Sequence, residues 1–371
     1  MLLLAEKHEY ANNYIEHLRD RFDLIAIVQR RDHNVSGVEL IRPAHRRALD
    51  RLRTAFNRWH TRYLPDANIQ AWLALRMSEH PYDLLVGRYL RPTVRSGALS
   101  HSPVVVDVDD LDAQTYLSMT GIPGVQSSEL RKRVRRAKAL DRATRNWLPR
   151  ASHLWVTNEH DRRTVGPDRA TILPNIPLSP PAEPSPPKRE ATAVFIVTSI
   201  KHHANARAIQ RFVHHVWPQI KSRCPSAVLH IAGSNMTPRQ KADWSSVPGV
   251  QPLGLVDDLQ AAYADCAFAA VPIYEGGGTK IKILEALSHG RTCVVTRHSH
   301  RGFEDSLSDG KSLLVADDED QFAEACVRLL SDPELRDALA SRGHAEVTRR
   351  FTYPAFERII ADTINRICPA F

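Results

Sequence analysis

The stretch EGGGTKIKILEALSHG, residues 275–290, brings together groups that can hold a diphosphate. Glycines let an anion approach backbone N–H groups closely, and the start of a helix offers unpaired N–H groups with a partial positive charge of roughly +0.5. A hydroxyl and two ammonium groups follow the glycines. The residues concerned are Gly276, Gly277, Gly278, Thr279, Lys280 and Lys282. This pattern predicts a phosphate-binding loop that opens a helix.

A carboxylate lies further along the same expected helix. Glu285 is about one and a half turns in, too deep to cap the helix, and can accept hydrogen bonds from two sugar hydroxyls. The motif is neither the P-loop GxxxxGK[ST] nor the dinucleotide fingerprint GxGxxG. We therefore expect a sugar nucleotide; the alternative is a tight glycine turn followed by solvated lysines.

A second group of candidates follows an apolar run in the N-terminal half. In VVVDVDDLD, residues 104–112, Asp109 and Asp110 come where a strand should end. Their carboxylates could contact the hydroxyls of a second substrate, an acceptor. A loop or helix cap explains them equally well. No histidine stands at ligand spacing and no CxxC pair occurs, so we expect no metal.

Positive charge is concentrated in the N-terminal half. Residues 1–150 contain 25 Lys and Arg against 17 Asp and Glu, whereas residues 151–371 contain 25 of each. The surplus lies mainly in 41–63 and 131–145. Each segment could be an ordinary helix that faces solvent or the core. Each could instead contact anionic lipid, an interaction worth about 1 kcal/mol per basic residue. The first also carries a helical apolar stripe of Leu52, Phe56, Trp59 and Tyr63.

Bulk composition is that of a globular protein. The chain has 371 residues, 43% hydrophobic and 25% charged. No apolar run approaches the roughly 18 residues of a membrane span, and the start MLLLAEKHEY does not resemble a secretion signal. The scattered cysteines suggest reduced thiols. We expect a cytoplasmic protein with no nucleic-acid partner, peripheral on the inner face of the membrane if the basic segments bind lipid.

The elements needed to position these residues form two similar halves. A proline-rich segment, 177–190, divides the chain. Short apolar runs alternate with helical patterns on both sides, as expected for parallel sheets covered by helices on both faces. We predict two Rossmann-like, doubly wound α/β domains, 1–176 and 191–352, with an amphipathic helix in the tail, 353–371.

The C-terminal half also resembles a known family. VPIYEGGGTKIKILEALSHGRTCVVT is similar to the donor-site signature of family-four-type glycosyltransferases with the GT-B fold. Weaker similarity extends to VVVDVDDL, residues 104–111, in the N-terminal half. The resemblance implies two Rossmann-like domains facing a cleft, with the tail helix crossing back onto the first. It also implies a retaining transfer without catalytic metal or cofactor, from a nucleotide-diphospho-sugar to a glycan or lipid-linked acceptor in cell-surface polysaccharide or glycoconjugate synthesis.

The resemblance assigns roles to particular residues. Glu285 would hold the nucleotide ribose, the loop 276–279 would lie under the diphosphate and sugar, and Lys280 or Lys282 would stabilise the leaving group. Val256 would lie against the base. Further donor contacts would come from the first loop of the C-terminal domain: Ser199, Lys201 and Asn205.

Two features depart from the family pattern. The family spaces two glutamates eight residues apart, but Gly277 stands eight residues before Glu285. The first N-terminal strand also lacks a glycine-rich loop after it. The catalytic histidine that the resemblance implies has only His8 and His101 as candidates. An alternative function therefore stays open: a degenerate GT-B protein that binds a nucleotide sugar or a partner transferase without turnover.

Overall fold

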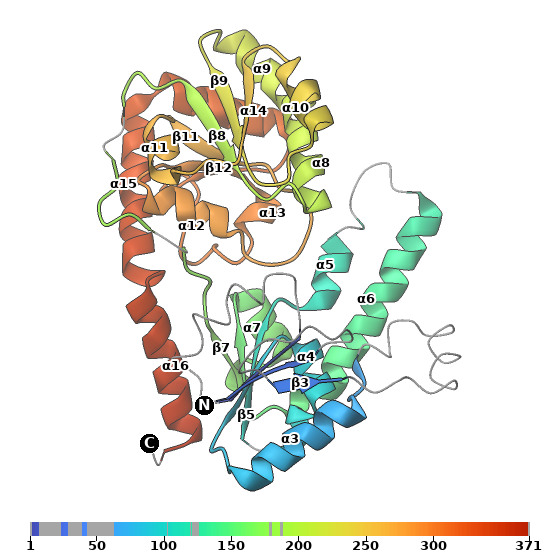
Figure 1. The fold of residues 1–371 in the computed structure, drawn as a ribbon. Helices are drawn as coiled ribbons and strands as arrows, with labels where there is room; N and C mark the ends of the chain where they lie inside the picture. The colour runs from blue at the N-terminus through green and yellow to red at the C-terminus, as the bar shows by residue number, and fades with distance from the viewer. Residues whose placement is uncertain are drawn as a thin grey trace.

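The computed structural model describes residues 2–6, 24–28, 39–42, 63–101, 103–118, 120, 126–177, 180–185 and 188–369. Figure 1 shows two lobes joined by the linker and by a long C-terminal helical arm. The expected helix over 8–22 and most of the basic segment 41–63 lie outside the described residues. Tyr63, the last residue of the apolar stripe in that segment, is 2% exposed and packs in the N-terminal core.

The described N-terminal strands form two parallel sheets, in the orders β1-β2-β3 and β4-β5-β6-β7. Most were expected from the apolar runs; β3 is a short strand that the pattern does not indicate. The elements are β1 Leu2–Glu6, β2 Leu24–Val28, β3 Glu39–Ile41, α3 Ala67–Glu79, β4 Leu85–Arg88, α4 Leu90–Ser96, β5 Val104–Asp109, α5 Asp112–Ser118, α6 Ser127–Trp147, β6 His153–Val156, α7 Glu159–Val165 and β7 Ala170–Ile172.

The C-terminal domain has one six-stranded parallel sheet in the order β10-β9-β8-β11-β12-β13. In chain order this is 3-2-1-4-5-6, the arrangement of a dinucleotide-binding fold. Its elements are β8 Ala193–Val197, α8 His203–Arg211, a π-helical turn Phe212–Val216, α9 Trp217–Arg223, β9 Val228–Ala232, α10 Pro238–Ser245, β10 Val250–Gly254, α11 Leu259–Ala264, β11 Phe268–Val271, α12 Ile281–Ser288, β12 Cys293–Thr296, α13 Arg297–His300, β13 Leu314–Ala316, α14 Glu319–Ser331, α15 Pro333–Arg350 and α16 Tyr353–Ile367.

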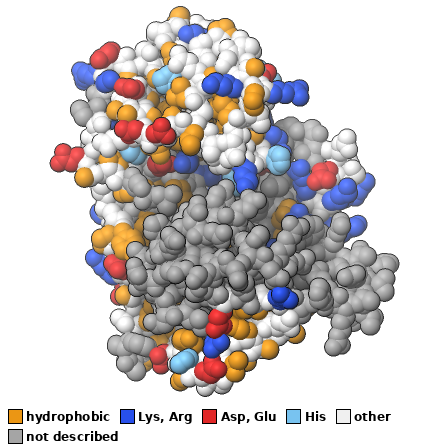
Figure 2. Space-filling view, viewed as in Figure 1, with side chains coloured by type: hydrophobic (Ala, Val, Ile, Leu, Met, Phe, Trp, Pro, Cys, Tyr) orange, Lys and Arg blue, Asp and Glu red, His pale blue; other side chains and the backbone are white. Residues whose placement is uncertain are grey.

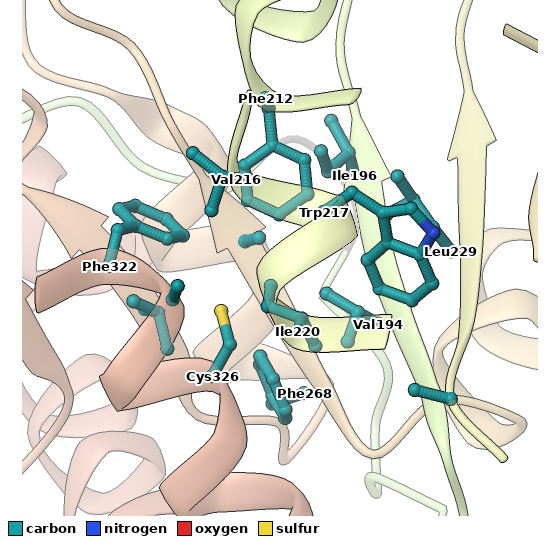
Figure 3. Close-up of a cluster of buried hydrophobic side chains, with 14 of the residues drawn as sticks. Val194, Ile196, Phe212, Val216, Trp217, Ile220, Leu229, Phe268, Phe322 and Cys326 are labelled. Atoms are coloured by element: carbon teal, nitrogen blue, oxygen red, sulfur yellow. The ribbon is translucent and has the colours of Figure 1, made fainter. Parts of the chain in front are cut away.

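Alternation along the strands builds a core on each face of this sheet. In β8, Val194 and Ile196 pack into one cluster, while Phe195 packs into the other. Figure 3 shows the first cluster, where Trp217 and Phe212 meet the strands and Phe322 of α14. Because both faces are covered, the loops at the strand ends are left to carry function.

The helix α16 returns to the N-terminal domain, as the family resemblance implied. It runs down beside the lower lobe in Figure 1. Its Phe356, Ile359 and Ile360 pack against Val105 and Trp155 of the N-terminal sheet. The Trp155 Nε1 donates a hydrogen bond to Thr363 Oγ1 at 3.1 Å. This helix therefore covers part of one face of the N-terminal sheet.

The linker is tied to the C-terminal domain by a buried arginine. The Arg291 side chain, in a residue 1% exposed, donates from Nε to the Tyr263 and Cys266 carbonyls at 2.8 and 3.1 Å. Its Nη1 donates to the Ser185 carbonyl in the linker at 3.0 Å. One side chain thus satisfies backbone groups from three segments.

We expect Arg291→Met to lower the free energy of unfolding by at least about 3 kcal/mol, because it leaves several buried carbonyls without donors. Urea denaturation of the two proteins measures the difference. Arg239→Met, at an exposed arginine of α10, is the matched control and should leave the midpoint unchanged. Equal midpoints for all three proteins would contradict this role.

Candidate functional site

The larger pocket lies where the strand order of the C-terminal sheet reverses. β8 and β11 are neighbours there, and in such sheets ligands bind beyond the carboxyl ends of the strands at this point. The pocket encloses about 640 Å³. Its lining includes the loop after β8 and the loop after β11, with these polar residues and glycines: Thr198, Ser199, His202, His203, Asn205, Arg207, Glu275, Gly276, Gly277, Thr279, Lys280 and Lys282.

The glycines of the second loop are required by its backbone. Gly276 and Gly278 have φ of 101° and 71°, which side chains rarely adopt. A Cβ on Gly278 would also lie 2.6 Å from Asp110 Oδ2 of the N-terminal domain. The loop therefore has the geometry that its three glycines suggested, and the other domain approaches it closely.

Lys280 is held over the loop. It occupies the N-cap position of α12, and its Nζ donates to the carbonyls of Gly277 and Gly278 at 2.5 and 3.0 Å. Burial lowers the Lys280 pKa to about 8; Asp110 opposes this shift, and Arg301 adds to it. A buried ammonium beside a loop of this kind is suited to a phosphate.

Glu285 sits within α12 and is paired inside the protein. Its Oε2 lies 2.6 Å from Lys282 Nζ, and its side chain is 16% exposed. Glu285 also helps raise the pKa of the buried Tyr263, although burial of that phenol is the larger cause. Lys282 lines the larger pocket. Glu285 does not line it, but its carboxylate contacts a residue that does.

The first loop is braced by Asn205. Its Nδ2 donates to Thr198 Oγ1 at 2.7 Å and to the Ser199 carbonyl at 2.9 Å. Ser199 lines the larger pocket, whereas Lys201 is exposed and lines neither of the two pockets. Val256 packs against the core cluster below α12.

Asp109 and Asp110 are separated by the structure. Asp109, at φ 60°, pairs with Arg88 at 3.2 Å and accepts a weak hydrogen bond from Asn175 at 3.4 Å. Asp110 instead faces Gly278 and influences Lys280. Of the two carboxylates, Asp110 is the one at the loop.

Two more N-terminal side chains reach across to the glycine loop. The Ser118 Oγ accepts a hydrogen bond from Gly276 N at 3.0 Å, and Asn175 Nδ2 donates to Thr279 Oγ1 at 3.0 Å. The loop is thus part of the contact between the domains. Figure 2 shows Lys and Arg side chains along the lower margin of the upper lobe.

A smaller pocket, of about 100 Å³, lies on the N-terminal side of the same loop. Asp110, Asn158 and Asp161 contribute from one domain, and His298 and Arg301 from the other. Both pockets are lined by Gly276 and Gly277. The two cavities therefore lie against the same loop; one is lined by the C-terminal domain alone and the other by residues of both domains.

Sequence reasoning missed His298 and Arg301. They follow β12, and their position just beyond a parallel strand was the signal that could have identified them. Burial, Lys280 and Arg301 lower the His298 pKa to about 4. His101 lies three residues before β5 begins, at the amino end of that strand, whereas Asp109 and Asp110 lie at its carboxyl end. His8 lies outside the described residues.

Comparison with known families agrees with this geometry. A model described as glycosyl transferases group 1 matches residues 191–332, less than half of the chain. This part of the chain is therefore similar to glycosyl transferases group 1. The match takes in the glycine loop, α12 and both pocket-forming strands, β8 and β11. Among curated proteins, none matches the chain significantly.

Several solved structures share the fold of this chain along most or all of its length. Sucrose-phosphate synthase from Thermosynechococcus elongatus aligns with a TM-score of 0.66 and 13% identity, covering 100% of both chains. HepE of Anabaena, in complex with UDP, aligns with a TM-score of 0.63 and 12% identity over 98% of this chain and 99% of HepE. TarM aligns with a TM-score of 0.60 and 12% identity over 80% of this chain, which spans only 58% of TarM. The chain has the GT-B fold, and its residues 191–332 match the model of glycosyl transferases group 1.

Proposed function

We propose that the chain transfers a glycosyl group from a nucleotide-diphospho-sugar to a hydroxyl of a glycan or lipid-linked acceptor, with retention of anomeric configuration and without a catalytic metal. The observation that carries this proposal is the glycine loop, with Lys280 at its end, at the strand-order reversal of the C-terminal sheet. HepE structures with UDP-glucose, and a Staphylococcus aureus TarM mutant structure with Fondaparinux and UDP, support donor and glycan-acceptor binding by analogy.

The diphosphate would lie on the loop amides and Lys280. Negative charge grows on the leaving oxygen as the bond to the sugar breaks, and preorganised N–H groups and an ammonium stabilise that charge. Arg301 adds a second cation from the other side of the loop. Glu285 would bind the ribose hydroxyls after exchanging its contact with Lys282, and the segment at Val256 would lie against the base.

The acceptor would approach through the smaller pocket between the domains. Asp110, which faces Gly278, is placed to accept a hydrogen bond from the acceptor hydroxyl. The reaction is a front-face displacement: the acceptor oxygen bonds to the anomeric carbon, the carbon–oxygen bond to the diphosphate breaks, and the proton passes to the leaving diphosphate. No protein nucleophile takes part.

A basic face on α6 supports an anionic membrane surface as a further partner. Its exposed side chains Arg131, Arg135, Lys138, Arg142 and Arg145 are spaced four, three, four and three residues apart. At the right of Figure 2, Lys and Arg side chains gather over α6. Arg145 also pairs with Asp141. Among the helices that the structure describes, none is long and apolar enough to cross a membrane.

The proposal is tested with the purified chain, UDP-, GDP-, dTDP- and ADP-sugars, and a panel of glycan and lipid-linked acceptors. We expect transfer from one donor, unchanged by a metal chelator, with the anomeric configuration retained by NMR. Nucleotide-sugar binding with no turnover on any acceptor would favour the non-catalytic alternative. Inversion would contradict the front-face reaction.

The Lys280 pKa predicts how donor binding depends on pH. The free protein holds this ammonium up to a pH of about 8, and a bound diphosphate raises the pKa further. Above pH 8 the free protein must take up a proton to bind. The Kd for nucleoside diphosphate should therefore be flat between pH 7 and 8, then rise by up to about tenfold per unit. Calorimetric titrations of the wild type and Lys280→Arg, which stays charged, measure this. Equal rises in both proteins would contradict the assignment.

A further inference from the structure

Glu275 is a buried carboxylate in the larger pocket that the mechanism above does not use. The residue is 5% exposed and directly precedes the glycine loop. Its Oε1 accepts hydrogen bonds from Arg207, from Nε at 2.7 Å and from Nη2. Its Oε2 is buried and has no hydrogen-bond partner among the described residues. Half of this carboxylate is therefore left unsatisfied.

An unsatisfied oxygen of this kind is costly. Buried polar groups usually have a hydrogen-bond partner, and an exception calls for an explanation such as a ligand. Leaving a buried neutral acceptor without a donor costs about 1–3 kcal/mol, and a charged one costs more. A ligand hydroxyl in the pocket would remove that cost.

The surroundings of Glu275 indicate which part of a donor it would meet. Arg207, on α8, pairs with Glu275 at the strand-order reversal. The Arg207 side chain is 53% exposed, so it balances the negative charge of Glu275 without closing the pocket. Thr279 and Lys280 line the same pocket and are proposed to hold the diphosphate. The nucleoside is proposed to lie toward Glu285 and Val256. The glycosyl group is the part of the donor that remains.

We propose that Glu275 Oε2 accepts a hydrogen bond from one hydroxyl of the transferred sugar, so that Glu275 selects a glycosyl group that carries this hydroxyl. The inference rests on the proposed function and adds the basis of its sugar specificity. A site built to receive a hydroxyl discriminates strongly against the analogue that lacks it, because its own polar group is then left unpaired.

The experiment combines sugar analogues with variants of Glu275. The probes are UDP, UDP-glucose and its 2-, 3-, 4- and 6-deoxy analogues, or the equivalent set on the nucleotide that the donor panel selects. For the wild type, one deoxy analogue should bind about 10- to 100-fold more weakly than the parent sugar nucleotide. Glu275→Ala should bind that analogue and the parent equally, and should bind the free nucleoside diphosphate as tightly as the wild type does.

Glu319→Ala is the matched control. Glu319, on α14, pairs with Arg211, which lies one turn after Arg207 on α8. Glu319 does not line the larger pocket. This variant should keep the wild-type preference. Glu275→Gln, which keeps the shape of the side chain, serves where the alanine variant does not fold, and should show a reduced preference.

The outcomes separate this inference from the proposed function. Glu275 does not bind the sugar hydroxyl if Glu275→Ala or Glu275→Gln keeps the full wild-type preference among the deoxy sugars. The same conclusion follows if the substitution weakens binding of the nucleoside diphosphate as much as binding of the sugar nucleotide. If the wild type binds no nucleoside diphosphate at all, the proposed function fails first.

Discussion

Replacing Lys280 with alanine is expected to lower kcat for glycosyl transfer by about 100- to 1000-fold, the usual cost of removing one preorganised group that stabilises a developing oxyanion. The ammonium is already fixed over the loop by the Gly277 and Gly278 carbonyls, so little reorganisation is needed when charge develops on the leaving diphosphate. Steady-state kinetics with saturating donor and acceptor measure this effect.

Lys311→Ala, at an exposed lysine before β13, is the control for the loss of one positive charge and should keep wild-type kcat. The Lys280→Ala protein should melt at or above the wild-type temperature, since it no longer buries an ammonium. A kcat within a factor of about three of the wild type would show that Lys280 does not act on the leaving group.

Replacing Glu285 with alanine should weaken nucleoside diphosphate binding by at least about 100-fold. Two hydrogen bonds from ribose hydroxyls to a charged carboxylate would be lost, each worth roughly 1.5–3 kcal/mol. Calorimetry with the nucleoside diphosphate measures the affinity, and the thermal shift produced by the same ligand should disappear.

Glu346→Ala is the comparison for Glu285, because it also breaks an ion pair between residues three apart on a helix, with Arg349 on α15. It should bind the nucleoside diphosphate normally. An unchanged affinity in Glu285→Ala would mean that the carboxylate serves only its contact with Lys282.

Much of the fold follows from local patterns in the chain. The buried strands β8, β11 and β12 read directly as continuous apolar runs, because both of their faces are covered. The amphipathic pattern of α16 predicted a packed helix, and the family resemblance predicted where it packs. The strand order, by contrast, depends on pairing between segments far apart in the chain, which short-range periodicity does not encode.

The residues of the site also divide into those that local sequence predicted and those that it did not. The loop and Lys280 were predicted because glycine, lysine and a helix start are adjacent in the chain. Glu275, Arg207 and His298 were missed because their significance comes from neighbours far away in sequence, such as the 68 residues that separate Arg207 from Glu275. Asp109 and Asp110 were equivalent in sequence, and only the turn after β5 directs Asp110 toward Gly278.

The Gly276–Lys280 loop is expected to hold the donor diphosphate. A crystal structure of the chain with its nucleotide sugar would show this contact. Phosphate oxygens should lie within hydrogen-bonding distance of the loop amides and of Lys280 Nζ, with the sugar in the larger pocket. A nucleotide sugar bound elsewhere, with Lys280 still held only by its two carbonyls, would contradict this expectation.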